Sequence, residues 1–162
     1  MRIHIATDHA GLDFSTHLQQ HLRAAGHDVI DHGPPGYDPL DDYPAFCINA
    51  AKAVAADQQA GVQALGIVFG GSGNGEQIAA NKVKGIRAAL VWNLSTAQLA
   101  RQHNDANVVA IGARQHTVDE ATSLIDAFIA EPFSFEERHV RRIAQLAEFE
   151  ATGDIAGKNV DH

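Results

Sequence analysis

The sequence predicts an α/β fold, a doubly wound three-layer sandwich built around a five-stranded parallel sheet. Short β-type runs alternate with longer helical segments along the chain. Residues 64–69 are apolar throughout, as expected of a strand covered on both faces. Right-handed crossovers between parallel strands place helices on both sides of the sheet. A length of 162 residues fits one such domain.

The five predicted strands and the helices between them follow one another in regular order. The strands are residues 2–7, 27–31, 64–69, 87–92 and 107–111. The first helix is predicted over residues 12–25, because Gly26 follows where a helix C-cap glycine belongs. After a turn-rich segment over residues 33–42, Asp42 is predicted to cap a helix with Pro44 in its first turn.

The later helices carry their own start signals. Three capping boxes are predicted: Ser95 with Gln98, Thr117 with Glu120, and Ser134 with Glu137. The last helix should run from about residue 135 to residue 150. We therefore expect one domain over residues 1–150 and a polar C-terminal tail over residues 151–162.

Charge and composition exclude several classes of function. The formal net charge is −8, whereas nucleic-acid and membrane-surface binding need a basic face. The sequence contains no run of 18 apolar residues, which a bilayer-spanning helix would need. No secretory signal pattern opens the chain either, so we expect a cytoplasmic protein. The single cysteine, Cys47, allows no internal disulfide and is predicted to be a buried thiol in a helix. His17 and His21, four residues apart, are interpreted as surface histidines, because two ligands make a poor metal site.

The glycine-rich segment over residues 70–76 is the most informative motif. It follows the third strand directly, and in this fold class ligands bind beyond the carboxyl ends of the strands. The segment lacks the lysine of a P-loop, the third glycine of a dinucleotide fingerprint and the last glycine of a nucleophile elbow. Its backbone N–H groups can still converge on an anion, and Glu76 follows them. This pattern favours proton abstraction beside a carbonyl, with Glu76 as base and the N–H groups holding the enediolate oxygen.

Several segments together resemble the ribose-5-phosphate isomerase type B family, which also includes galactose- and allose-6-phosphate isomerases. They cover roughly residues 1–150 and match in order and spacing: Asp8 to Gly11, Asp41 to Pro44, Gly70 to Glu76, Ala79 to Lys82, His103-Asn104, Gly112 to Arg114, and Arg138 to Arg142. One branch of that family has a catalytic cysteine at the position of Ser72. This chain resembles the other, mainly actinobacterial branch, in which the glutamate is the base. The resemblance implies a Rossmann-like fold.

The resemblance also implies roles for individual residues. Glu76 would move the proton between C1 and C2, and His103 would assist opening of the furanose ring. The substrate-binding residues would be Asp8, His9, Gly71, Ser72, Gly73, Asn74, Gly75, Asn104, Arg114, Arg138 and Arg142, of which the arginines hold the phosphate. No metal and no organic cofactor is expected, since no three metal ligands visibly converge in the sequence. The implied assembly is a homodimer, or a dimer of dimers, whose sites are shared between chains.

Structural explanations remain open for most of these residues. Asp8 can simply cap the following helix, and His103 can simply occupy a helix C-terminus. Arg138 and Arg142 lie four residues apart and can form a solvated basic face, on which Arg141 is an equally placed neighbour. The substrate can also be another aldose phosphate, such as a tetrose phosphate, galactose 6-phosphate or allose 6-phosphate. A sugar-phosphate sensor without activity is the alternative outside enzymes.

Overall fold

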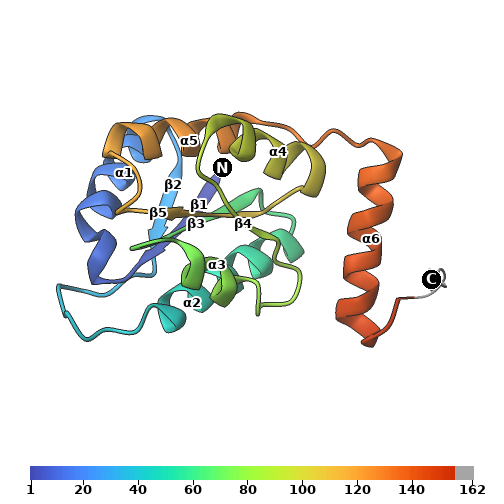
Figure 1. Cartoon of the computed structure of the whole chain (residues 1–162), viewed down its shortest axis with the longest axis horizontal. Helices are drawn as coiled ribbons and strands as arrows, with labels where there is room; N and C mark the ends of the chain where they lie inside the picture. Colours follow the sequence, from blue (N-terminus) through green and yellow to red (C-terminus); the bar gives the residue numbers. More distant parts are fainter. Residues whose placement is uncertain (156–162) are drawn as a thin grey trace.

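A computed structural model describes residues 1–155 of the chain and contains the predicted five-stranded parallel sheet. The strands lie in the order β2-β1-β3-β5-β4 (Figure 1). Their bounds are β1 Arg2–Thr7, β2 Asp28–Asp31, β3 Ala64–Gly70, β4 Ala88–Leu90 and β5 Val108–Gly112. Every neighbouring pair is parallel, and β3 at the centre is buried along its whole length. The predicted fold class is confirmed.

Helices cover both faces of this sheet and so form the three layers. The bounds are η1 His9–Gly11, α1 Leu12–Ala24, α2 Tyr43–Gln59, α3 Asn74–Ala80, α4 Leu94–Asn104, α5 Val118–Ala130 and α6 Glu137–Thr152. One core cluster joins the sheet to α1, α4 and α5, and a second joins its other face to α2 and α3. Strand β1 serves both clusters by alternation, since Ile3 and Ile5 enter the first and Ala6 the second.

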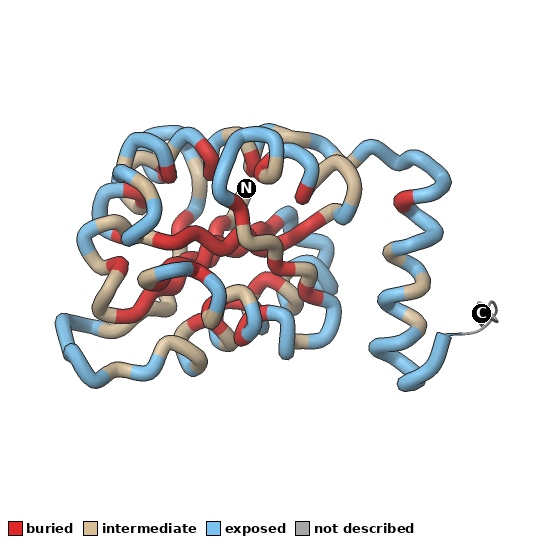
Figure 2. Tube along the Cα trace, in the orientation of Figure 1, coloured by how far each residue is buried: buried red, intermediate tan, exposed pale blue. Residues whose placement is uncertain are grey.

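Helix α6 differs from the others because it stands away from the sheet (Figure 1). His139 is its one buried residue in the described part of the chain, and the remainder of the helix is exposed or half-buried (Figure 2). A groove of about 620 Å³ lies between this helix and the β4 edge of the sheet. The expected boundary between domain and tail, at residue 150, falls inside α6, and residues 156–162 of the tail lie outside the described residues.

The start signals of the helices agree only in part with the predicted ones. The capping box of Thr117 and Glu120 is confirmed. The box predicted from Ser95 and Gln98 is wrong, because Asn93 and Thr96 form it instead, closer to the end of β4. The box predicted from Ser134 is also wrong, because α6 begins only at Glu137. Asp42 stands at the N-cap of α2, but its side chain caps no N–H group of the described residues.

None of the helices in the described part of the chain is both long enough and apolar enough to span a membrane.

Candidate active site

The candidate site lies at the crevice where the chain leaves β1 and β3 on opposite faces of the sheet. These two strands are direct neighbours, with Thr7 beside Phe69 at their carboxyl ends. From β1 the chain passes to α1 on one face, and from β3 it passes to α3 on the other. Such a switch point leaves a crevice beyond the strand ends, where ligands bind in open α/β sheets. Asp8 and His9 enter it from β1, and the glycine loop over residues 70–76 enters it from β3.

The glycine loop is held by backbone hydrogen bonds from the turn after β5. The N–H groups of Ala113 and Arg114 donate to the carbonyl oxygens of Gly70 and Gly71, at 2.8 and 3.1 Å. Gly73 has a φ of +79°, and a side chain there would press on the Leu90 side chain and on the backbone at the end of β5. The loop therefore needs glycine at this position for both its conformation and its close packing. The same turn brings the Arg114 side chain beside Gly71.

Glu76 points its carboxylate back at the end of β3 from the first turn of α3. Glu76 is only 4% exposed, and any side chain at position 70 would overlap its carboxylate. Burial raises the pKa of the Glu76 carboxyl, its own backbone N–H lowers it, and the negative charge of Asp8 raises it further. A carboxylate with a raised pKa is a stronger base near neutrality, which suits proton abstraction from carbon.

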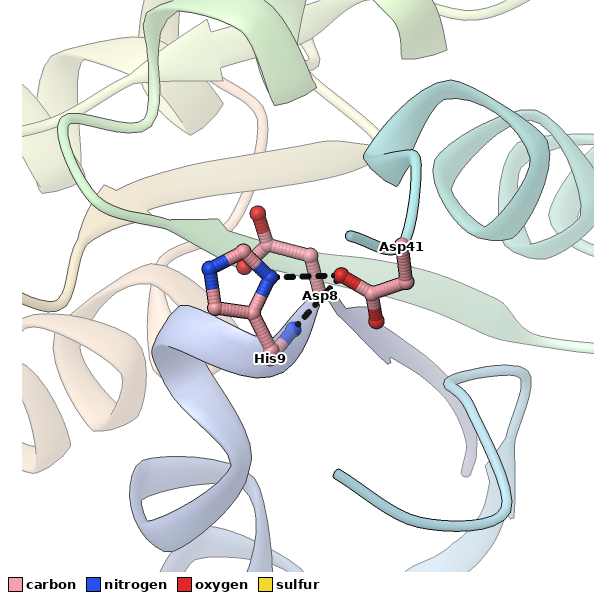
Figure 3. A group of neighbouring side chains, drawn as sticks. All are labelled: Asp8, His9 and Asp41. Carbon is pink, nitrogen blue, oxygen red and sulfur yellow. Dashed lines mark hydrogen bonds and ion pairs between the residues drawn. The ribbon is translucent and has the colours of Figure 1, made fainter. Parts of the chain in front are cut away.

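Asp8, His9 and Asp41 lie close together beyond the carboxyl end of β1 (Figure 3). The Nδ1 atom of His9 is 2.6 Å from Asp41 Oδ1, and the backbone N–H of His9 donates to the same oxygen at 3.2 Å. Asp8 Oδ1 accepts the N–H of Ala10 at 2.9 Å, so Asp8 does cap the short helix η1. The cap occupies one oxygen only, and the carboxylate remains within the site.

Asp41 is a site residue that the sequence prediction missed, although it lies in one of the matching motifs. Its side chain is 7% exposed, and its Oδ2 atom has no hydrogen-bond partner among residues 1–155. Asp8, His9 and Asp41 offer ligand atoms that all lie within 4.8 Å of one another, so they could hold a metal ion. The expectation that no three ligands converge is therefore wrong. The loop over residues 33–42 causes this, because it returns Asp41 to the end of β1.

Cys47 and Tyr43 belong to α2, which packs under the glycine loop. Burial, together with the negative charges of Glu76 and Asp8, raises the pKa of the Cys47 thiol to about 12. The thiol stays protonated near neutrality, which confirms the predicted buried thiol. The Tyr43 ring packs against Gly75 so closely that a side chain at Gly75 would overlap it.

His103 and Asn104 lie at the opposite edge of the sheet, because α4 runs antiparallel to the strands. The carbonyl oxygen of Asn104 accepts from Nε of Arg87, which stands just before β4 begins. The four steps between the five residues of β5, at roughly 3.3 Å each, separate this amino edge from the carboxyl edge by about 13 Å. His103 stacks instead on His139 of α6, with ring centroids 4.2 Å apart.

Arg138 and Arg142 are also remote from Glu76 along the fold, since both belong to α6. Arg138 forms an ion pair of 2.9 Å with Glu136, which stands just before its own helix. One chain therefore brings together Asp8, His9, the glycine loop, Glu76 and Arg114. It does not bring His103, Asn104, Arg138 and Arg142 to them.

Comparison with known proteins shows which family the chain is related to. A family model described as Ribose/Galactose Isomerase matches residues 3–146. The chain belongs to this isomerase family. A ribose-5-phosphate isomerase B of Mycobacterium tuberculosis is 53% identical over 152 residues, which are 94% of this chain and 91% of that protein. A crystal structure of ribose-5-phosphate isomerase B from Mycoplasma genitalium with bound ribulose-5-phosphate is 40% identical. The two structures match with a TM-score of 0.88, and the match covers 93% of this chain and 97% of the Mycoplasma chain.

The isomerase family also contains relatives with another printed substrate. A galactose-6-phosphate isomerase subunit of Clostridium acetobutylicum is 37% identical and covers 91% of this chain and 84% of its own length. Membership of the family alone therefore does not specify whether the sugar substrate has five or six carbons.

The residue at position 72 of this isomerase is a serine, and its hydroxyl braces the glycine loop. Ser72 Oγ accepts the backbone N–H of Asn74 at 3.3 Å and lies 3.2 Å from Asn74 Nδ2. These contacts tie Ser72 to the loop backbone, while Glu76 presents a buried carboxylate to it. The geometry favours Glu76 as the base of this chain.

Proposed function

We propose that the chain interconverts D-ribose 5-phosphate and D-ribulose 5-phosphate through a cis-enediolate. The observation that carries the proposal is the buried Glu76 carboxylate, which faces a glycine loop at the switch point of the sheet. The family membership and the identity to ribose-5-phosphate isomerases B support the same reaction.

Glu76 is proposed to carry one proton between two carbons. It takes the C2 proton of the open aldose, the C–H electron pair forms the C1–C2 double bond, and the carbonyl oxygen O1 becomes an oxyanion. Backbone N–H groups of residues 71–75 stabilise that charge. Glu76 then returns the proton to C1 while the O2 hydroxyl loses its proton to O1, which leaves the ketone at C2. The carbonyl itself acidifies the proton, so the step requires no metal and no organic cofactor.

His103 and the basic residues are proposed to act on the other parts of the substrate. His103 donates a proton to the ring oxygen O4 as the C1–O4 bond breaks, and Asp8 accepts the proton of the O1 hydroxyl. The phosphate is bound by His9, Arg114, Arg138 and Arg142, with Asn104 on the sugar. The charged substrate does not cross a bilayer unaided, so we place the reaction in the cytoplasm.

The proposal requires a second copy of the chain, because Glu76 and His103 stand at opposite edges of one sheet. Helix α6 carries the arginines and also exposes apolar side chains, with Leu146 55% and Phe149 54% exposed. Docking α6 on a partner would bury these side chains and bring its arginines to the partner's site. Two-fold closure gives a homodimer with two equivalent sites, and a dimer of dimers repeats the unit.

The number of carbons in the sugar substrate gives the most direct test of the proposal. Turnover should be measured on aldose phosphates of four, five and six carbons, including galactose 6-phosphate and allose 6-phosphate. We expect the highest kcat/KM for ribose 5-phosphate. A preference for a six-carbon phosphate would assign the chain to the activity of the galactose-6-phosphate relative. Binding of the panel without any turnover would identify a sensor.

A further inference from the structure

The joint between α4 and α6 contains a buried histidine that the proposed reaction does not use. His139 is 2% exposed, in a helix that otherwise has no buried residue among those described. Its ring lies on the ring of His103, with centroids 4.2 Å apart and planes tilted by 37°. Because the two rings are stacked, the orientation of His103 depends on the position of His139.

Ser134 fixes His139 in turn. A hydrogen bond of 2.8 Å joins Ser134 Oγ to His139 Nδ1, and the same oxygen accepts the N–H of Glu136 at 3.3 Å. The Ser134 N–H donates to the carbonyl oxygen of Gln102, the residue before His103, at 3.1 Å. The segment before α6 is thus fastened to the last turn of α4, and this fastening sets where the His139 ring lies.

Burial and the surrounding charges favour the neutral form of His139. Burial lowers the pKa of His139, and the positive charges of His103, Arg138 and Arg142 lower it further, while Glu136 raises it. Two imidazolium rings stacked at this distance would repel each other. A neutral His139 avoids this repulsion beside His103, which is only half-buried.

We propose that His139 is a positioning residue, which holds the His103 ring in the orientation that delivers a proton to the furanose oxygen of the substrate. The inference rests on the proposed role of His103. Since it concerns ring opening alone, it predicts no effect on a substrate that is already open. 4-Deoxy-D-ribose 5-phosphate is such a substrate, because it has no O4 with which to close a furanose.

The experiment measures kcat and KM on ribose 5-phosphate and on the 4-deoxy compound for a set of variants. We expect His103→Ala to lower kcat on ribose 5-phosphate by about 100-fold, and His139→Ala to lower it by about 10-fold. The double variant should be no slower than His103→Ala, because both changes remove one function. On the 4-deoxy compound all three should stay within about twofold of the unchanged protein.

Two further variants separate positioning from catalysis and guard against failure to fold. His139→Phe keeps an aromatic face and burial, and should restore kcat on ribose 5-phosphate to within about threefold of the unchanged protein. The pH dependence of kcat should stay the same as in the unchanged protein. Ser134→Ala removes only the hydrogen bond to Nδ1 and should lower kcat about threefold. Gln102→Ala is the matched control, since it breaks the 2.7 Å contact with Glu131 at the same joint and should leave both substrates unaffected.

The contrary results are distinct. If His139→Ala raises KM equally for both substrates with kcat unchanged, His139 only docks the arginine helix and the inference is overturned. A changed pH dependence of kcat in His139→Phe would make His139 itself the proton carrier and would overturn the inference as well. If His103→Ala turns over ribose 5-phosphate normally, the proposed role of His103 fails first. If His103→Ala is slow while His139→Ala and Ser134→Ala are normal, only the positioning role of His139 fails.

Discussion

The carboxyl edge of the sheet and helix α6 are built on opposite principles. At the carboxyl edge Glu76 is almost fully buried, and the glycine loop is fastened by backbone hydrogen bonds from the turn after β5. Helix α6 buries one residue and exposes its three arginines and several large apolar side chains. The first region is complete within one chain. The second leaves large apolar side chains such as Leu146 and Phe149 exposed, as interaction surfaces commonly do.

This contrast teaches that the proposed base and two of the proposed phosphate-binding arginines, Arg138 and Arg142, lie in separate parts of the molecule. Burial at the edge of the sheet raises the pKa of the Glu76 carboxyl. An arginine needs no such tuning, because it is charged at every relevant pH. A base must therefore belong to a finished core, whereas the arginines can be supplied by an exposed helix.

The largest effect is expected at the buried base. Glu76→Gln keeps the shape of the side chain but removes the basic oxygen, so kcat should fall by about 10³-fold or more with little change in KM. Steady-state assays in both directions measure this. Glu137→Gln, an exposed acid at the start of α6, is the control and should be silent. Near-normal turnover by Glu76→Gln would contradict the proposal that Glu76 is the base.

Mixing two impaired variants, assayed at a substrate concentration far below KM so that each alone has little activity, tests whether the two regions meet across a dimer. Chains with Glu76→Gln and chains with Arg142→Ala are unfolded and refolded together. One of the two sites in each mixed dimer regains both residues, so about a quarter of the original activity should return if chains pair at random. Sizing and mass measurements must show that mixed dimers form. Mixed dimers without recovered activity would mean that both residues serve the same site from one chain.

The arginines of α6 should affect binding more than catalysis. Arg142→Ala or Arg138→Ala should weaken binding of substrate and of inorganic phosphate together, by about 1.5–3 kcal/mol for a charge-assisted contact. Isothermal titration with phosphate measures it. Arg141→Ala is the neighbouring control and should cost much less. Normal phosphate binding by the Arg138 and Arg142 variants would give α6 another role.

A smaller effect is expected on stability, with a defined dependence on pH. Folding raises the pKa of the Glu76 carboxyl from its ordinary 4.5, so the folded state binds its proton more tightly and loses stability as pH rises above that value. Glu76→Gln should therefore unfold at a higher temperature than the unchanged protein at pH 7, by about 2–4 °C. The difference should vanish at acidic pH, where the carboxyl is protonated in both states. Thermal scans that show the reverse trend would contradict a raised pKa.

The smallest effect, none at all, is expected from removing metals. Activity should survive exhaustive dialysis against EDTA, even though Asp8, His9 and Asp41 converge at the carboxyl edge. We expect Asp8 and His9 to bind the substrate instead, with Asp41 holding the His9 ring through their 2.6 Å contact. Loss of activity that zinc or magnesium restores would instead make this group a metal centre.

The sequence alone was sufficient for the fold class and for the half of the site that follows the strands. Apolar runs and glycine punctuation reflect local backbone preferences, and the carboxyl ends of parallel strands share one edge whatever the details of packing. This is why the positions of Asp8, His9, residues 70–76 and Arg114 at one edge follow from the order of the strands. The buried state of Cys47 follows in the same way from its apolar neighbours in a helix.

Only the tertiary structure decided the remaining points. Asp41 reaches His9 because a turn-rich loop folds back, and the path of such a loop is not encoded in a period or a spacing. His103 is predicted to act with Glu76, yet the direction of α4 carries it to the other edge, where it meets His139. Ser134 is predicted as a helix cap, but its hydroxyl contacts that same His139. Each of these contacts joins residues through the packing of whole elements, and packing depends on the complete fold, whereas the strands and the glycine loop depend on their own neighbours in the chain.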